Sequence, residues 1–210
     1  ASRKVATTTF PCNFQLIDST TQHAVYDGVS TDSGMDESAG EQVYQLDFSK
    51  VSAPGRYYVL AGNGERSHTF VIGEHVYGQL QLDLMKCFYF QRCGCALTSE
   101  YAGEYTHAAC HTEDAVFLED YMNQTPDPSH FDMTGGWHDA GDFGRYISPA
   151  AVAVGHLLYA YELFPESFQA SLHIPESGNL LPDILNECLY ELKWMLKMQA
   201  DNGGVYHKLT

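Results

Sequence analysis

The sequence predicts a multidomain protein, with an all-β sandwich over residues 1–73 and an all-α part over residues 74–210. Short runs of alternating apolar and polar residues fill the first part, as expected for half-buried strands. After Gly73 the apolar residues recur every three or four positions, which is typical of helices. With 210 residues and 44% apolar side chains, the chain has the size and composition of one large or two smaller folded domains.

Turn residues and spacing define the predicted sandwich. The Gly62-Asn63-Gly64 segment separates two strand-like runs and predicts a hairpin, because Asn and Gly tolerate positive φ angles. Residues 1–9 show little alternation, so we expect the first strand to be missing or incomplete. Strands at short spacing with turn residues between them favour a small sandwich. The strand-like runs are residues 14–16, 44–48, 56–60 and 68–72.

Apolar stripes predict the helices of the second part. The last stripe is the clearest, with Pro182 and Asp183 suited to its first turn and Asn202-Gly203-Gly204 to its end. A loop over about residues 94–146, rich in His, Asp, Gly and Pro, separates the first two helices, and loops of this length are usually functional. The stripes are Val76, Leu80, Leu84, Cys87 and Phe88, then Ala151, Val154, Leu158 and Tyr161, then Ile184, Leu185, Cys188, Leu189, Leu192, Met195 and Leu196.

The charge balance narrows the range of partners. The 27 acidic and 11 basic side chains give a net charge of -16, which repels phosphate backbones and anionic membranes. We therefore expect neither nucleic acid nor a membrane as a partner, and neutral substrates or cations fit better. The sequence has no apolar run of about 18 residues, and its first residues contain no apolar signal-peptide region.

The long loop contains two carboxylates three residues apart, Asp139 and Asp142. Small residues surround them, and Gly141 permits close backbone approach, so both side chains can reach one reacting centre. Two neighbouring carboxylates are able to hold and deprotonate a water molecule, and Trp137 offers a flat apolar surface for a sugar ring. A capping turn or a calcium-binding turn uses the same residue types, and the spacing alone leaves these alternatives open.

The wider string 134–146 closely resembles the signature of glycoside hydrolase family 9, the inverting β-glucanases that include many endoglucanases. Its Gly-Gly-Trp-His-Asp-Ala-Gly-Asp core, residues 135–142, is a specific match. The resemblance covers most of the chain. Further segments resemble this family, or the immunoglobulin-like module often found ahead of its catalytic domain, namely residues 47–49, 54–57, 89–94, 108–111 and 175–185.

This resemblance implies a fold, an activity and a location. The fold is an immunoglobulin-like sandwich followed by the first helices of an all-α (α/α)6 barrel, which is incomplete in this chain. The activity is that of an endo-β-1,4-glucanase (cellulase), secreted or at the cell surface, acting on cellulose or mixed-linkage β-glucan. Asp142 corresponds to the general base, and Asp139 to the residue that helps to orient the attacking water.

The resemblance also implies that one catalytic group lies elsewhere. Inverting glycosidases need a general acid, roughly 6.5–9.5 Å from the base, to protonate the leaving oxygen. The family supplies a Glu far downstream for this purpose, and no segment of this sequence matches it. We expect the remainder of the catalytic domain in the same or a separate chain, and we expect the isolated chain to be inactive.

Cysteine and histidine residues near the motif suggest a metal site. Two thiolates and two imidazoles make a closed tetrahedral set for structural zinc, whereas buried thiols beside a solvated histidine are the alternative. The resemblance favours zinc, because members of the family carry this Cys…Cys-His pattern. The candidate ligands are Cys93, Cys110, His111 and His138, with His107 and His130 as other candidates for the fourth position.

Calcium is the second cation to consider, because members of the family often bind it. Ser177, Asp183 and Glu187 are candidate oxygen donors. Asp183 and Glu187 are also spaced as on an ordinary helix surface, so we do not assign them as ligands.

Two other functions are alternatives to the glycosidase, and both rank below it. A non-catalytic glucan-binding or scaffold module would use the sandwich and exposed aromatic side chains such as Tyr57, Tyr58 and Trp137. A zinc hydrolase would use Asp139, Asp142 and nearby His as ligands, but the sequence has no His-Glu-x-x-His string.

Overall fold

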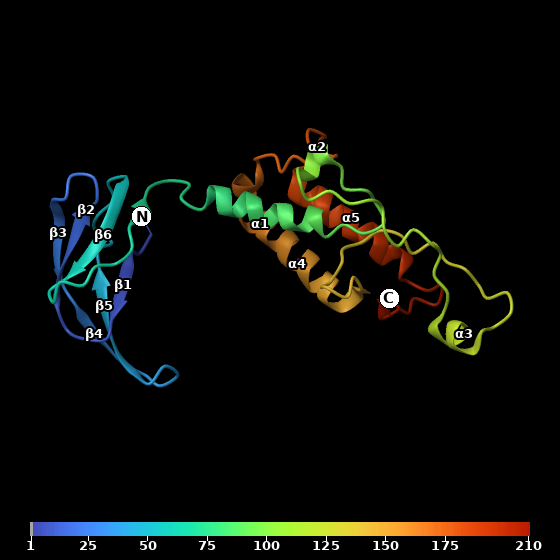
Figure 1. Cartoon of the computed structure of the whole chain (residues 1–210), viewed down its shortest axis with the longest axis horizontal. Coiled ribbons are helices and arrows are strands. Elements are labelled where there is room, and N and C mark those ends of the chain that lie inside the picture. Colours follow the sequence, from blue (N-terminus) through green and yellow to red (C-terminus); the bar gives the residue numbers. More distant parts are fainter. Residues whose placement is uncertain (1) are drawn as a thin grey trace. The chain divides into compact units, whose positions relative to one another are not determined.

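The computed structural model describes residues 2–210, which form two compact units divided between Gly78 and Gln79. The first unit consists of strands and the second mainly of helices (Figure 1). Across residues 2–210, every helix is too short or too polar to cross a lipid bilayer.

The first unit is a sandwich of two antiparallel sheets. The smaller sheet has the strand order β1-β5-β4, and the larger sheet has the order β3-β2-β6-β7. In chain order the strands are β1 Val5–Thr8, β2 Asn13–Asp18, β3 Ala24–Val29, β4 Thr31–Asp36, β5 Glu41–Asp47, β6 Gly55–Ala61 and β7 Phe70–Ile72.

An apolar core lies inside the sandwich. Strand alternation directs Phe14 and Leu16 of β2 into this core, because successive side chains of a strand point to opposite faces. Both sheets contribute, as expected where two sheets pack face to face. The buried members are Phe14, Leu16, Leu46, Phe48, Tyr57, Val59 and Ile72.

Two predictions about the strands have opposite outcomes. The hairpin is confirmed, because β6 and β7 pair antiparallel and Gly64 adopts a φ of +90° in the turn after β6. The expectation of a missing first strand is wrong, because β1 pairs with β5 from Val5 opposite Asp47 to Thr8 opposite Tyr44. Backbone hydrogen bonds hold this edge strand, so it forms without an alternating side-chain pattern.

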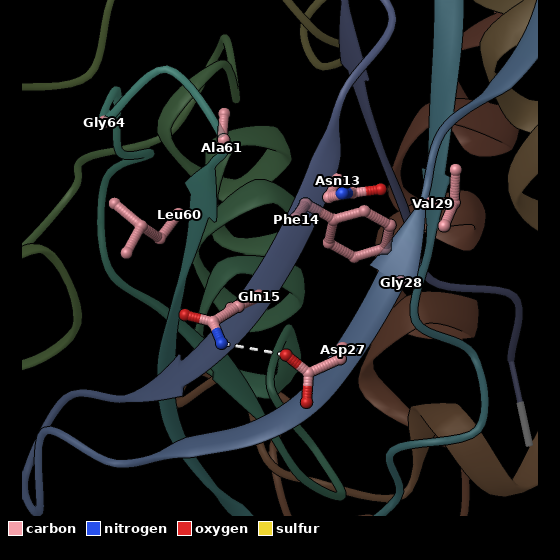
Figure 2. Close-up of a pocket in the computed structure, with 10 residues that line it drawn as sticks. Asn13, Phe14, Gln15, Asp27, Gly28, Val29, Leu60, Ala61 and Gly64 are labelled. Atoms are coloured by element: carbon pink, nitrogen blue, oxygen red, sulfur yellow. Dashed lines mark hydrogen bonds between the residues drawn. The ribbon is translucent and has the colours of Figure 1, made fainter.

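A groove is lined by β2, β3 and the end of β6 (Figure 2), and there Gln15 donates a hydrogen bond to Asp27 at 2.8 Å. Phe14 is the one aromatic residue among those that line the groove, and it is buried. Tyr57 and Tyr58 are also buried, with 3% and 8% of their surfaces exposed. The structure therefore contradicts the use of these two tyrosines as an exposed glucan-binding surface.

The second unit contains three longer helices and several short elements, in chain order α1 Gly78–Phe90, α2 Ser99–Ala102, α3 Leu118–Asn123, β8 Arg145–Tyr146, α4 Ile147–Leu163, the 3-10 helix Pro165–Phe168, α5 Asp183–Lys197 and β9 Lys208–Leu209. In Figure 1 the helices α1, α4 and α5 lie together. Met85 and Tyr89 of α1 join Ile184 of α5 in one apolar cluster, and Leu157 of α4 packs against it.

The predicted apolar stripes of α1 and α5 are only partly buried, because Ile184 and Cys188 of α5 are buried while other members of the stripes are exposed. Leu80 and Leu84 of α1 are exposed, and so are Leu192 and Leu196 of α5. The buried face of α5 is instead largely polar, because its side chains pair with backbone and side-chain groups of the long loop and of the end of α1. The buried residues of α5 are Asp183, Ile184, Asn186, Glu187, Cys188, Glu191 and Trp194.

Candidate active site

The segment that carries the two carboxylates begins with a close approach to α5. Gly135 and Gly136 have φ angles of +105° and +77°, a region that favours glycine. A Cβ atom at Gly136 would lie 2.7 Å from the ring of Trp194, closer than a side chain tolerates. The two glycines therefore let the backbone run directly against the helix.

Buried side chains fix the backbone that follows. The carboxylate of Glu191 accepts a hydrogen bond from the Trp137 amide at 2.6 Å, and Arg145 donates to the carbonyl of Gly135 at 2.7 Å. Burial raises the pKa of Glu191 to about 7, while the Trp137 amide and the charge of Arg145 act in the opposite direction. Both side chains thus hold the motif backbone from inside the second unit.

A buried ion pair lies at the end of α1. Arg92 donates to both carboxylate oxygens of Glu176, at 3.0 and 2.9 Å, and its Nη2 lies 3.0 Å from Glu187 Oε1. The rings of Tyr89 and Tyr190 lie 5.2 and 4.3 Å from the guanidinium carbon. Burial alone would lower the pKa of Arg92, but its two carboxylate partners raise it above its ordinary value, so this cation stays charged.

Asp139 and Asp142 are both exposed, so both carboxylates are accessible. The Asp139 amide donates to the Gly144 carbonyl at 2.8 Å and closes the turn. Asp142 accepts hydrogen bonds from the Tyr146 hydroxyl at 2.7 Å and from the Gly144 amide at 3.1 Å. These bonds, with that from Tyr146 foremost, lower the pKa of Asp142 below its ordinary value. Asp142 is therefore an ionised carboxylate on a fixed turn, and the ionised form is the one that can accept a proton.

Trp137 does not present its ring to solvent. Only 7% of its surface is exposed, and its ring packs against Phe88 at a centroid distance of 4.9 Å. Its backbone forms a β-bridge with Arg92. The structure therefore contradicts the expected role of Trp137 as a sugar-stacking surface, because the same residue anchors the motif to the core.

The structure brings the four predicted zinc ligands together, with their ligand atoms all within 4.8 Å of one another. Cys110 Sγ lies 3.9 Å from Cys93 Sγ and 3.4 Å from His138 Nε2. Cys93 Sγ lies 3.4 Å from His111 Nδ1. A tetrahedral site with zinc bonds of about 2.3 Å to sulfur and 2.0–2.1 Å to nitrogen has ligand–ligand edges of about 3.3–3.8 Å. The donor set and its spacing therefore fit zinc.

The cluster connects three parts of the second unit. Cys93 follows α1, the middle ligands belong to the long loop, and His138 directly precedes Asp139. Burial raises the pKa of Cys93 to about 12 and lowers the pKa of His138. A bound cation would favour the thiolate and the neutral imidazole, which are the forms that coordinate metal. His107 and His130 are not members of the cluster.

The three calcium candidates are engaged by protein groups. Asp183 accepts hydrogen bonds from the Leu172 amide at 2.7 Å and from the Ser177 hydroxyl at 2.6 Å. Glu187 is paired with Arg92. Their oxygens therefore have structural partners, and we assign no calcium site to them.

Three residues that hold the site were not identified from the sequence. Arg145 and Tyr146 stand within the string 134–146, but the sequence pattern assigns a role to neither. The third is Glu191, which is fully buried. Glu191 stands between apolar positions of the predicted helix, and this placement could have identified it. A carboxylate on a buried helix face needs a hydrogen-bond donor as a partner.

Comparisons with known proteins agree with this organisation. The sequence profile of Glycosyl hydrolase family 9 matches residues 77–209, and that of the Cellulase N-terminal ig-like domain matches residues 1–67. A cellodextrinase from Butyrivibrio fibrisolvens is 43% identical over 213 residues, covering 99% of this chain and 37% of the relative. Endoglucanase D from Acetivibrio thermocellus is 38% identical over 190 residues, covering 89% of this chain and 30% of the relative. The chain thus spans 37% or less of the length of these relatives.

Solved structures show the same fold. A thermostable endoglucanase from Alicyclobacillus acidocaldarius, solved as a single mutant, matches with a TM-score of 0.82 and 32% identity over 100% of this chain and 37% of that chain. A Zn-binding triple mutant of the family 9 endoglucanase J30 matches with a TM-score of 0.84 and 34% identity, covering 98% and 40% of the two chains. The chain therefore belongs to glycosyl hydrolase family 9, and it carries the immunoglobulin-like sandwich and the first helices of the (α/α)6 barrel.

Proposed function

We propose that this chain contributes the catalytic base of an inverting endo-β-1,4-glucanase that hydrolyses cellulose or mixed-linkage β-glucan. The observation that carries the proposal is the exposed carboxylate of Asp142, ionised and held on a turn that buried groups fix. The names of the relatives, cellodextrinase and endoglucanase, support the substrate class.

Asp142 acts as the general base of the reaction. It takes a proton from a water molecule, whose oxygen attacks the anomeric carbon from the face opposite the leaving group. Asp139, on the same turn, helps to orient this water. As the glycosidic bond breaks, a general acid gives a proton to the leaving oxygen, and we assign that acid to residues outside this chain.

We assign structural zinc to Cys93, Cys110, His111 and His138. With four protein ligands, zinc would keep no open position for water, so it would cross-link the chain rather than enter the chemical step. His138 is adjacent to Asp139, and its amide donates to the Gln91 carbonyl at 2.8 Å. The ligand and the carboxylate turn are thus held by the same stretch of backbone.

The second unit has exposed apolar side chains that are suited to packing against further helices of the same catalytic domain. Leu84 on α1, Tyr159 on α4 and Leu196 on α5 are examples. We infer that the remainder of the barrel, in the same or a separate chain, covers these side chains. A polymeric glucan does not enter cells, so we also infer that the protein acts as a secreted or cell-surface enzyme.

The stereochemistry of hydrolysis tests the proposed function. The chain joined to its natural continuation is given cellopentaose, and the new reducing ends are followed by proton NMR before they mutarotate. Inversion at a β-linkage releases the α-anomer first, and initial release of the β-anomer would contradict the proposal. The 210-residue chain alone is the control and should show no turnover. Robust turnover by that chain would show that our placement of the acid is wrong.

A further inference from the structure

The carboxylate of Asp142 has a donor on each of its oxygens. The Tyr146 hydroxyl donates to Oδ2 at 2.7 Å, and the Gly144 amide donates to Oδ1 at 3.1 Å. Two donors on different oxygens fix the plane of a carboxylate, whereas one donor leaves it free to rotate. Each oxygen accepts through one lone pair and retains another for a proton.

Tyr146 is itself held in place by the two-stranded sheet of β8 and β9. Tyr146 pairs with Lys208 across this sheet, and the next amide, of Ile147, donates to the His207 carbonyl at 3.1 Å. The Lys208 ammonium lies 5.5 Å from the centre of the Tyr146 ring, and the His207 ring lies 6.3 Å away. The Tyr146 hydroxyl therefore reaches Asp142 from a stretch of backbone that is hydrogen-bonded to residues 207–208.

Gly144 leaves room for this contact. A Cβ atom at Gly144 would lie 2.9 Å from Tyr146 Cε2 and 3.2 Å from Asp142 Oδ2. The first distance is shorter than real contacts of a Cβ atom, so any other residue would push the tyrosine ring away from the carboxylate. The neighbouring Phe143 adopts a φ of +54°, which is uncommon outside glycine. Such conformations concentrate where the surrounding structure enforces a functional geometry.

We propose that Tyr146 is a positioning residue for the catalytic base, and that its hydroxyl fixes the Asp142 carboxylate in the orientation that receives the proton of the attacking water. This inference rests on the proposed function of Asp142. Tyr146 acts through Asp142 and takes no proton itself. The same hydrogen bond raises the pKa of Tyr146, which keeps the phenol protonated as the donor.

The charged and titratable groups around Asp142 and Tyr146 shift the pKa values of the two residues in opposite directions. Lys208 on β9 lowers the pKa of Asp142, after the larger effects of Tyr146 and Gly144. His207 stands before β9, beside the Tyr146 ring, and Asp139 on the motif turn raises the pKa of Tyr146. Tyr146→Phe keeps the ring near Lys208 and His207 and removes only the hydroxyl, so it isolates the hydrogen bond.

Carboxyl NMR titration of the 210-residue chain tests the inference. Aspartate is labelled with carbon-13 at the side-chain carboxyl, and the Asp142 signal is assigned by its loss in Asp142→Asn. The expected result is an upward shift of the Asp142 midpoint in Tyr146→Phe, with an unchanged midpoint in Tyr159→Phe, the matched control. Tyr159 is exposed on α4, away from the motif turn. Gly144→Ala should shift the Asp142 midpoint in the same direction.

An unchanged Asp142 midpoint in Tyr146→Phe, in a protein whose amide spectrum is otherwise that of the parent, would overturn the inference. If that variant does not fold, Gly144→Ala decides on the same criterion. The titration requires no turnover, so its outcome is independent of whether the proposed glucanase activity is found.

Discussion

The core of the sandwich and the core around α5 are built from different kinds of side chain. The sandwich core consists of apolar residues such as Leu16 and Phe48. Around α5, Glu187 and Glu191 are fully buried, while Leu196 on the same helix is 71% exposed. Apolar burial stabilises without regard to direction, whereas a buried carboxylate requires donors in a fixed geometry. The buried hydrogen bonds and ion pairs of α5 thus lie in the region that holds the backbone of residues 135–146.

The two regions are open to separate measurement. Trp137 and Trp194 are the two tryptophans of the chain, and both lie in the second unit. Tryptophan fluorescence therefore follows the unfolding of the second unit alone. Circular dichroism follows both units, so a comparison of the two signals locates the effect of a substitution.

Loss of the metal should produce the largest difference between the two units. Structural zinc has an apparent binding free energy of about 10–16 kcal/mol in zinc-finger peptides, which is coupled to folding. We expect Cys110→Ser to remove stoichiometric zinc and to lower the midpoint of the fluorescence transition, with the sandwich unaffected. Cys95→Ser, outside the cluster, is the matched control and should retain the metal. Unchanged zinc content in Cys110→Ser, measured by elemental analysis, would rule out the assignment.

Breaking the buried ion pair should have the next largest effect. Arg92→Met leaves Glu187 buried without its cation, and loss of one partner of a buried pair costs about 3–5 kcal/mol. Urea titration followed by fluorescence measures this loss. The double variant with Glu187→Leu should recover part of it, because no unpaired carboxylate remains. Equal stabilities of the single and double variants would show that the pair is not coupled.

Glu191 should make the second unit less stable as the pH rises. Its pKa is raised to about 7 from 4.5, so the unfolded chain loses the proton first. Stability therefore falls between these pH values, by about 3 kcal/mol for a shift of this size. Glu191→Gln keeps an acceptor for the Trp137 amide and does not titrate. We expect the variant to gain stability relative to the parent from pH 4.5 to 7, and an identical pH dependence of both proteins would contradict this.

The smallest effect is expected on the exposed apolar face of α5. Leu196→Ala should change the stability of this chain by no more than about 0.5 kcal/mol, because the side chain is already in water. Leu16→Ala, at a fully buried position of the sandwich, should cost about 2–5 kcal/mol. Denaturant titration followed by circular dichroism compares the two. A large loss in Leu196→Ala would show that this face is covered in the isolated chain.

Local patterns predict the sandwich, and the resemblance to family 9 predicts the ligand cluster, but neither predicts the buried polar residues of the second unit. The hairpin at Gly64 depends on turn chemistry that neighbouring residues specify. The contact between Glu191 and Trp137 joins positions 54 residues apart, so a periodic pattern within one helix or strand cannot predict it. The sequence therefore predicts a surface role for Trp137, which its burial excludes. Tyr146 was within the recognised string, yet only the fold brings its hydroxyl to Asp142.

The most direct test of the account is the activity of Asp142→Asn in the chain joined to its natural continuation. Asparagine keeps the shape of the side chain, and its one amide oxygen can still accept from the Gly144 amide while its NH2 group faces the Tyr146 hydroxyl, which can accept from it. Asparagine cannot take a proton from water. We predict that hydrolysis of mixed-linkage glucan falls about 10²–10⁴-fold, the usual contribution of a general base, while the unfolding transition stays that of the parent. Turnover at the parental rate would contradict the assignment of Asp142 as the base.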